Sequence, residues 1–176
     1  MPTPTLGGAS SVLVNFPEII QEQSEWCWAA CIQMVLKYVD NSDSTTQCKI
    51  VSQGLGISGC CNNLSSSICN KPLQVPKVKE EWEKNGFSSI YNEFAIQFPT
   101  VVNEINQGRP IEIGWKYNGP GGHALLIVGY DKNNEKLFVN DPRLDGYRGY
   151  VDYSEVVSAF GEGSWEWTWT GIKRGA

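Results

Sequence analysis

The hexapeptide Trp26-Cys27-Trp28-Ala29-Ala30-Cys31 opens a segment in which apolar residues recur at helical spacing as far as Val39. Ser24 is a suitable N-cap, so the spacing predicts a helix over residues 26–39 with Cys27 in its first turn. The helix dipole and the free backbone N–H groups of a first turn favour a thiolate. Cys27 is therefore the candidate nucleophile of the chain.

The candidate base is His123, the single histidine of the 176 residues. It stands in residues 121–130 (GGHALLIVGY), where a Gly-Gly pair precedes an apolar run that predicts a buried strand. A thiol and an imidazole are the working parts of a cysteine nucleophile enzyme, in which the imidazole pairs with the thiolate and later protonates the leaving group. No second histidine competes for this role.

A third polar side chain is needed to orient the imidazole. The pair Asn133-Asn134 turns the predicted strand 124–130 into a second strand, 136–140, and this hairpin brings Asn140 or Asp141 beside His123. Successive side chains of a strand point to opposite faces, so only one of the two can reach the ring.

An oxyanion formed at Cys27 needs a second donor besides the Cys27 backbone N–H. Gln21, six residues before the thiol, is the preferred candidate, and Gln23 is the alternative. Glu25 stands two residues from the thiol and opposes a thiolate unless its side chain faces solvent.

The order of the predicted elements indicates the fold class. Helices are predicted near residues 46–51, 76–84 and 98–108. Strands follow over residues 110–117, 124–130, 136–140, 147–153 and 165–172, with a short helix near 154–160. We therefore expect an α+β fold in which an N-terminal helical half packs on a C-terminal antiparallel sheet, with the active site in the cleft between them. Candidates for the walls of that cleft are Trp28, Trp115, Gly121, Gly122 and the alternating Trp165, Trp167 and Trp169.

Six cysteines favour disulfide bonds and an oxidising destination over a metal site. No C-x-x-C pair is present, and the adjacent Cys60 and Cys61 have poor spacing for zinc, so no metal ion is predicted. Neighbouring cysteines rarely bridge each other, so Cys60 and Cys61 would take separate partners. With Cys27 kept as a thiol, the disulfide candidates are Cys31, Cys48, Cys60, Cys61 and Cys69; five is odd, so one of them stays reduced. The alternative is a set of free thiols in a cytosolic protein.

Composition limits the possible partners. A net charge of −5 without a Lys/Arg run argues against nucleic acid, and no apolar stretch approaches the ~18 residues of a membrane span. The length predicts one domain, over residues 21–176, behind a flexible arm over residues 1–20. The first residues lack the basic and apolar regions of a signal peptide, so we expect a mature form or another export route, with a cytoplasmic location as the alternative.

Three motifs together resemble the papain-like cysteine peptidases: Gln21 six residues before Cys27-Trp28, Gly122-His123-Ala124 followed by 128–130 (VGY), and 139–142 (VNDP). The resemblance extends from about residue 21 to about residue 153 and is strongest to bacterial members: staphopain-type enzymes, injected effector proteases and double-glycine leader peptidases. It implies a papain-like fold without a cofactor, with Cys27, His123 and Asp141 as the catalytic triad and Gln21 as the oxyanion donor. The orienting residue in papain is Asn, and Asn140 is the alternative here.

The expected function is that of a cysteine endopeptidase that acts on a protein or peptide substrate, as a monomeric and secreted bacterial protein. The same fold also carries deamidases, isopeptidases and acyl transferases, so these remain alternatives. A second alternative, from another class, is a papain-fold binding module that has lost its activity.

Overall fold

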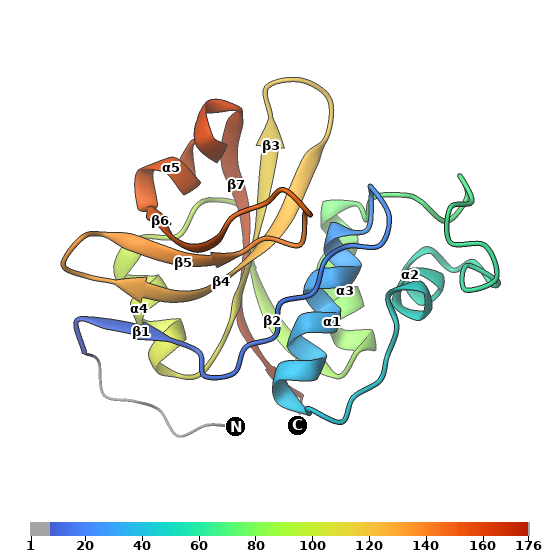
Figure 1. The fold of residues 1–176 in the computed structure, drawn as a ribbon, viewed down its shortest axis with the longest axis horizontal. Helices are drawn as coiled ribbons and strands as arrows, with labels where there is room; N and C mark the ends of the chain where they lie inside the picture. Colours follow the sequence, from blue (N-terminus) through green and yellow to red (C-terminus); the bar gives the residue numbers. More distant parts are fainter. Residues whose placement is uncertain (1–7, 176) are drawn as a thin grey trace.

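The computed structural model describes residues 8–175 as helices gathered beside one antiparallel sheet (Figure 1). The helices are α1 (Cys27–Val39), α2 (Gln47–Leu55), α3 (Val75–Lys84), α4 (Phe98–Asn106) and α5 (Tyr153–Val157), followed by a 3-10 turn at Ala159–Gly161. The strands are β1 (Ser10–Val12), β2 (Phe87–Asn92), β3 (Ile111–Tyr117), β4 (Gly122–Asp131), β5 (Lys136–Asn140), β6 (Arg148–Asp152) and β7 (Gly163–Arg174). The predicted α+β class and antiparallel sheet are confirmed.

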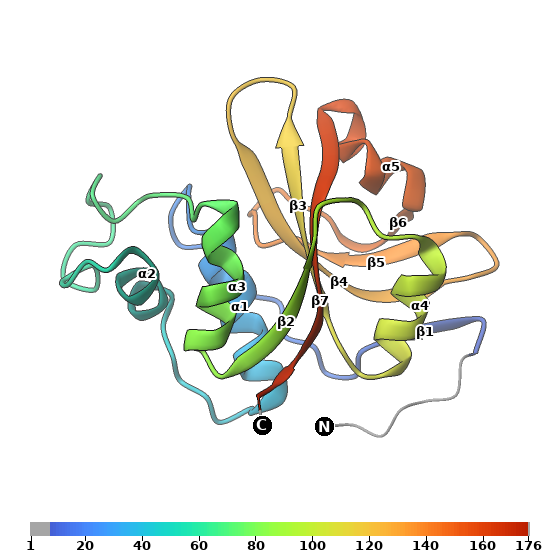
Figure 2. The same cartoon turned by 180° about the vertical axis from the view of Figure 1, so that it is seen from behind.

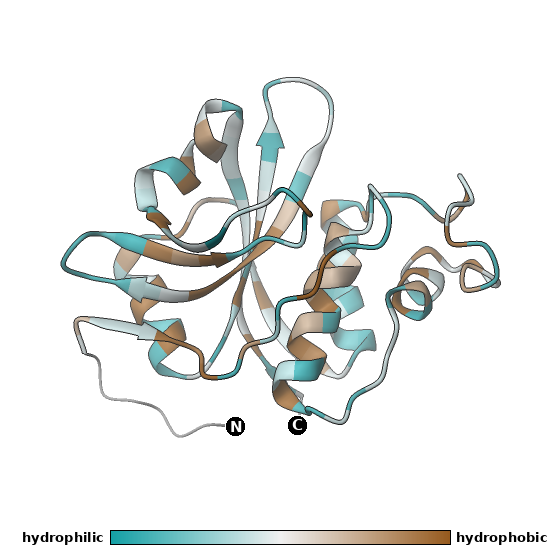
Figure 3. Cartoon of the chain, viewed as in Figure 1, coloured by the Kyte–Doolittle hydropathy of each residue, from teal (hydrophilic) through white to brown (hydrophobic). Residues whose placement is uncertain are grey.

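The sheet separates two groups of helices. Its order is β2-β7-β3-β4-β5-β6, with β1 paired to β4. The helices α1, α2 and α3 lie on one side of the long strands β3 and β7, and α4 and α5 lie on the other (Figures 1 and 2). The helix α1 buries eight of its thirteen residues, all of them between Trp28 and Leu36. Apolar residues accordingly follow α1 and the strands that face the core (Figure 3).

The prediction of a flexible arm over residues 1–20 is wrong for residues 10–20. Ser10–Val12 forms β1, and the Leu13 N–H continues along β4 by donating to the Val128 carbonyl at 2.8 Å. Leu13 is buried, and the Pro17 carbonyl accepts from Asn140 Nδ2 at 2.9 Å. The segment is ordered because an apolar side chain and several backbone groups find partners on β4 and β5. Residues 1–7 of the predicted arm lie outside the described residues.

Two local expectations also need correction. Trp26, not Ser24, occupies the N-cap position of α1, and no side chain caps this end. The Ser24 hydroxyl instead accepts a hydrogen bond from Asn70. The strand β2, which pairs with β7 at the edge of the sheet, was not predicted, because its alternation is weak and it follows α3 after a single turn at Gly86.

Four of the candidate cysteines form two disulfides, Cys48–Cys61 and Cys60–Cys69, with Cα–Cα distances of 5.0 and 5.6 Å. Adjacent Cys60 and Cys61 thus take separate partners, as predicted. The prediction that Cys31 is a disulfide candidate is wrong: its thiol is free and fully buried on α1. Cys31 lies within α1, whereas the four bridged cysteines lie in α2 and the loop after it.

Candidate active site

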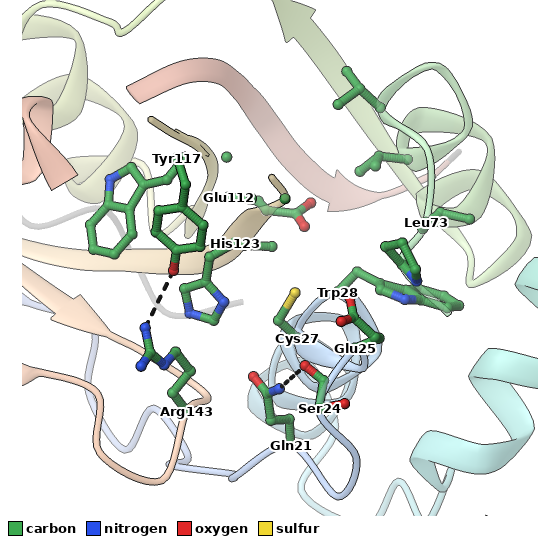
Figure 4. A pocket seen from close by; sticks show the side chains of 18 of the residues that line it. Gln21, Ser24, Glu25, Cys27, Trp28, Leu73, Glu112, Tyr117, His123 and Arg143 are labelled. Carbon is green, nitrogen blue, oxygen red and sulfur yellow. Dashed lines mark hydrogen bonds between the residues drawn. The ribbon is translucent and has the colours of Figure 1, made fainter. Parts of the chain in front are cut away.

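Cys27 and His123 come from opposite halves of the molecule and face each other across the cleft (Figure 4). Cys27 is the first residue of α1, and its thiol is free and half-buried. Backbone N–H groups of a first helical turn have no partner within the helix, so this end carries partial positive charge next to the sulfur. His123 is the second residue of β4, paired in register with Trp115 of β3, and it is buried.

Asp141 lies on the other side of the imidazole. Its Oδ1 is 2.6 Å from His123 Nε2, and only 3% of the residue is exposed. The Arg143 backbone N–H donates to the same oxygen at 2.9 Å. A Cβ at position 146 would overlap the Asp141 carboxyl, so Gly146 is what lets this turn close over it. The carboxylate is therefore held in place from several directions.

Asn140 points elsewhere. Its side-chain N–H donates to the Pro17 carbonyl, and its Oδ1 is buried without a hydrogen-bond partner. Of the two residues that the sequence places near His123, the structure brings Asp141 to the ring and directs Asn140 to the N-terminal segment. This division follows from the alternation of side chains along β5 and its extension.

The imidazole is charged at neutral pH. Burial disfavours the charged ring, but the hydrogen bonds to Asp141 and Cys27 and the charges of both groups outweigh it and raise the pKa of His123 to about 9. The position of Asp141 on Nε2 leaves Nδ1 for the sulfur (Figure 4). This arrangement can hold a thiolate and an imidazolium side by side.

The side chain of Gln21 is in the site, but its N–H groups are in use. Nε2 donates to the Gln23 carbonyl at 3.0 Å and to the Ser24 carbonyl at 2.9 Å. Its Oε1 is buried and has no hydrogen-bond partner. Gln23 also lines the cleft. Glu25 is exposed to solvent, as a carboxylate so close to the thiol must be if it is not to oppose a thiolate.

A loop that was not predicted to belong to the site fixes the tip of α1. Residues 69–71 accept from two indoles: Trp26 Nε1 donates to the Cys69 carbonyl at 2.9 Å, and Trp28 Nε1 donates to the Lys71 carbonyl at 3.1 Å. Asn70 accepts from the Glu25 backbone N–H. The Cys60–Cys69 disulfide ties this loop down directly at its first residue. The sequence offered no signal for these contacts beyond the cysteines themselves.

The cleft has a volume of about 1140 Å³ and takes its walls from both halves. The predicted wall residues Trp28, Trp115, Gly121 and Gly122 all line it, as do Trp167 and Trp169, whereas Trp165 is buried elsewhere. Residues that line it without having been predicted include Leu73, Glu112, Tyr117 and Arg143. Arg143 donates to the Tyr117 hydroxyl and to the Asp145 carboxylate, so it is already paired within the cleft.

The described part of the chain offers neither a metal site nor a membrane-spanning helix. Among residues 8–175, no group of three or more His, Cys, Asp and Glu side chains is placed to hold a metal ion. No helix in that range is long and apolar enough to cross a membrane.

Comparison with known proteins places this geometry in a family. Residues 13–171 match the Peptidase_C39 like family. The peptidase domain of Streptococcus ComA has a similar structure, with a TM-score of 0.65 and 12% identity over 92% of this chain and 100% of that chain. A putative C39-like peptidase from Bacillus anthracis has a TM-score of 0.58 and 14% identity over 95% and 99% of the two chains.

Interpain A, a cysteine protease of Prevotella intermedia, has a TM-score of 0.59 and 15% identity over 99% of each chain. No curated protein was found to match the chain in sequence. Identities this low establish the fold, while the match over residues 13–171 establishes the family. The chain belongs to the Peptidase_C39 like family and is a papain-like cysteine protease.

Proposed function

We propose that this protein is a cysteine endopeptidase that cleaves peptide bonds through a thioester on Cys27, with His123 as acid and base and Asp141 as the orienting residue. The observation that carries the proposal is the buried His123–Asp141 pair, 2.6 Å apart, which faces a free thiol at a helix N-terminus inside an open cleft. A structural histidine would not need a carboxylate on one nitrogen and a thiol on the other.

The reaction follows from the charges of the site. The Cys27 thiolate attacks the carbonyl carbon of the peptide, and the electron pair of the C=O bond moves to oxygen. When the oxyanion collapses, the C–N bond breaks and the His123 imidazolium gives its proton to the leaving amine. Neutral His123 then removes a proton from water, which attacks the thioester, releases the acid product and returns the sulfur as thiolate.

The oxyanion receives one hydrogen bond from the Cys27 backbone N–H in this mechanism. For Gln21 to supply the second, its side-chain amide must release one of the two carbonyls of the 21–24 loop. The Oε1 atom is buried without a hydrogen-bond partner, which disfavours the present orientation of the amide. We propose that substrate binding turns this amide into the cleft.

We also propose a single domain that includes residues 10–20, because β1 and Leu13 belong to its sheet and core. Two disulfides favour an oxidising compartment, and hence secretion or export. The partner is then a peptide or protein substrate, and the enzyme works as a monomer.

An epoxysuccinyl inhibitor of papain-like enzymes tests the proposal. We expect one adduct per molecule, located on Cys27 by peptide mass mapping and absent from the Cys27→Ala and His123→Ala variants. Cys31 is an internal control, because this thiol is buried and burial raises its pKa. Folded wild-type protein that takes no label on Cys27 and cleaves no peptide of a diverse library would refute the proposal.

A further inference from the structure

The mechanism leaves one carboxyl group of the cleft unused. Glu112 of β3 lines the cleft, although only 1% of the residue is exposed. Its carboxyl group lies between the catalytic pair and the wall that carries Leu73, with Trp28 below it (Figure 4). It is therefore a candidate to touch a substrate that enters the cleft.

Among residues 8–175, no Lys, Arg or His forms an ion pair with Glu112. Trp82 of α3 donates to Oε2 at 2.6 Å, and this is the one hydrogen bond of the carboxyl group within residues 8–175. Burial raises the pKa of Glu112 to about 8, against a smaller opposite effect of the Trp82 bond. Burial therefore favours the protonated, neutral form of this carboxyl group around pH 7.

The neighbours of Glu112 are almost all apolar. In the sheet it pairs with Leu126 of β4 and Trp169 of β7, and α3 contributes Trp82. The facing titratable group is the Cys31 thiol of α1, whose pKa is raised by burial and by Glu112. None of these residues supplies a positive charge.

The cleft that Glu112 lines has apolar walls. Trp28, Leu73 and Val78 line it from the helical half and Trp167 from the sheet. Gly114 makes room for the indole, because a Cβ there would lie 2.9 Å from Trp167 Cε3. Long aliphatic stems pack well on such surfaces, and Lys and Arg carry their charge at the end of one.

The charge around the cleft favours the same ligand. The lining residues include the acidic Glu22, Glu25 and Glu162. The guanidinium that lines the cleft, Arg143, is already paired with Asp145. A peptide that carries positive charge would be drawn to this cleft, and one that carries negative charge would be repelled.

We propose that Glu112 is a specificity-determining residue, which selects a Lys or Arg side chain of the peptide substrate next to the scissile bond. The inference rests on the proposed peptidase function and names the substrate class. A bound ammonium or guanidinium supplies the missing counter-charge, so Glu112 gives up its proton to solvent and forms an ion pair shielded from water.

Cleavage and binding test the proposal together. A positional-scanning peptide library is first digested with the wild-type enzyme, and we expect Lys and Arg to be preferred at one position near the cut. A peptide with Arg at that position is then compared with its citrulline analogue, which has the same shape without the charge. We expect the Arg peptide to bind the Cys27→Ala variant about tenfold more tightly or better, and to show the same advantage in kcat/KM on the wild type.

Glu112→Gln keeps the size of the side chain and an oxygen for Trp82. In this variant, we expect the kcat/KM of the Arg peptide divided by that of the citrulline peptide to be close to one. Glu81→Gln is the matched control, because Glu81 is also fully buried, lies next to Trp82 on α3 and does not line the cleft. In this control the ratio should stay at the wild-type value.

The pH dependence gives a second readout that needs no variant. Because Glu112 must lose a proton to pair with Arg, the preference for Arg over citrulline should grow as the pH rises from 6 to 8. Efficient cleavage of the library without a preference for Lys or Arg would overturn this inference and leave the peptidase intact. Absence of both cleavage and inhibitor labelling would instead remove the peptidase function and this inference with it.

Discussion

Asp141 and Asn140 are adjacent residues with opposite tasks. Asp141 holds the imidazole, and Asn140 fastens the N-terminal segment through the Pro17 carbonyl. The difference lies in the direction of each side chain from the same strand end. Their roles can therefore be separated by substitution.

We predict that Asp141→Ala lowers kcat/KM about 100-fold or more, because the ring loses both its orientation and the charge that keeps it protonated. Asn140→Ala should instead cost about 1 kcal/mol of stability, since the Pro17 carbonyl loses its donor, with a far smaller kinetic loss. Peptide hydrolysis and thermal unfolding of both variants measure this. Equal kinetic losses in the two would contradict the assignment.

The activity of the enzyme should fall at high pH, where His123 loses its proton. The active form holds the imidazolium, and its pKa is raised to about 9, so kcat/KM should fall as the pH rises through that value. Asp141→Asn removes a group that raises this pKa, so the alkaline limb should move to lower pH. A limb that stays in place in this variant would show that Asp141 does not set the charge of the ring.

At the residue scale, the sequence was least ambiguous where one residue type was unique. With one histidine, His123 had no rival, and Cys27 stood at the start of the most apolar helix. Sequence spacing could require that only one of Asn140 and Asp141 reach the ring, but not which one. Spacing also suggested Gln21 as an oxyanion donor, but not the orientation of its amide, which local contacts turn toward two loop carbonyls.

At the scale of elements, the tip of α1 depends on a loop that carries no catalytic residue. Residues 69–71 accept hydrogen bonds from both indoles that flank Cys27, and the Cys60–Cys69 disulfide anchors the first of them. The loop thus sets the position of the Cys27 thiol. The Cys48–Cys61 disulfide braces α2 and has no such contact with the helix tip.

We predict that the double variant Cys60→Ser/Cys69→Ser loses activity beyond what its stability explains. Removing either disulfide should cost about 3 kcal/mol. Only the loss of Cys60–Cys69 should also lower kcat/KM by about tenfold or more at a temperature where both variants are folded, because a small displacement of the thiol disrupts attack. Cys48→Ser/Cys61→Ser is the matched control. Equal kcat/KM in the two folded variants would argue against this role of the loop.

The elements that were predicted are those with a clear period. Apolar positions three and four apart marked α1, and the Asn133-Asn134 turn marked the β4–β5 hairpin. The strand β1 was missed because its three residues are strand-like only when paired with β4. Pairing partners far apart in sequence decide such segments, and a single sequence does not record them.

At the scale of the whole molecule, two halves meet along a cleft whose floor contains a buried acid. Folding must bury Glu112 without a counter-ion, and it does so by keeping the proton. The free-energy cost of burying this carboxyl group depends on pH. It lowers the stability of the whole fold, because the group lies between β3, α1 and α3. This cost can be measured by unfolding experiments without any substrate.

The direction of this effect follows from proton linkage. The pKa of Glu112 is about 8 in the folded protein and has an ordinary value of 4.5, so between these values the folded state holds a proton that the unfolded chain has lost. The contribution of Glu112 to stability is fully present below pH 4.5 and is lost progressively as the pH rises toward 8.

We predict that Glu112→Gln, made in the Cys27→Ala background to prevent self-digestion, gains stability relative to its parent over this range. The gain should reach a few kcal/mol near pH 8. Denaturant unfolding of the pair at pH 4.5, 6 and 8 measures it. A stability difference that does not change with pH would mean that Glu112 is ionised in the empty cleft, and that the fold already contains its counter-charge.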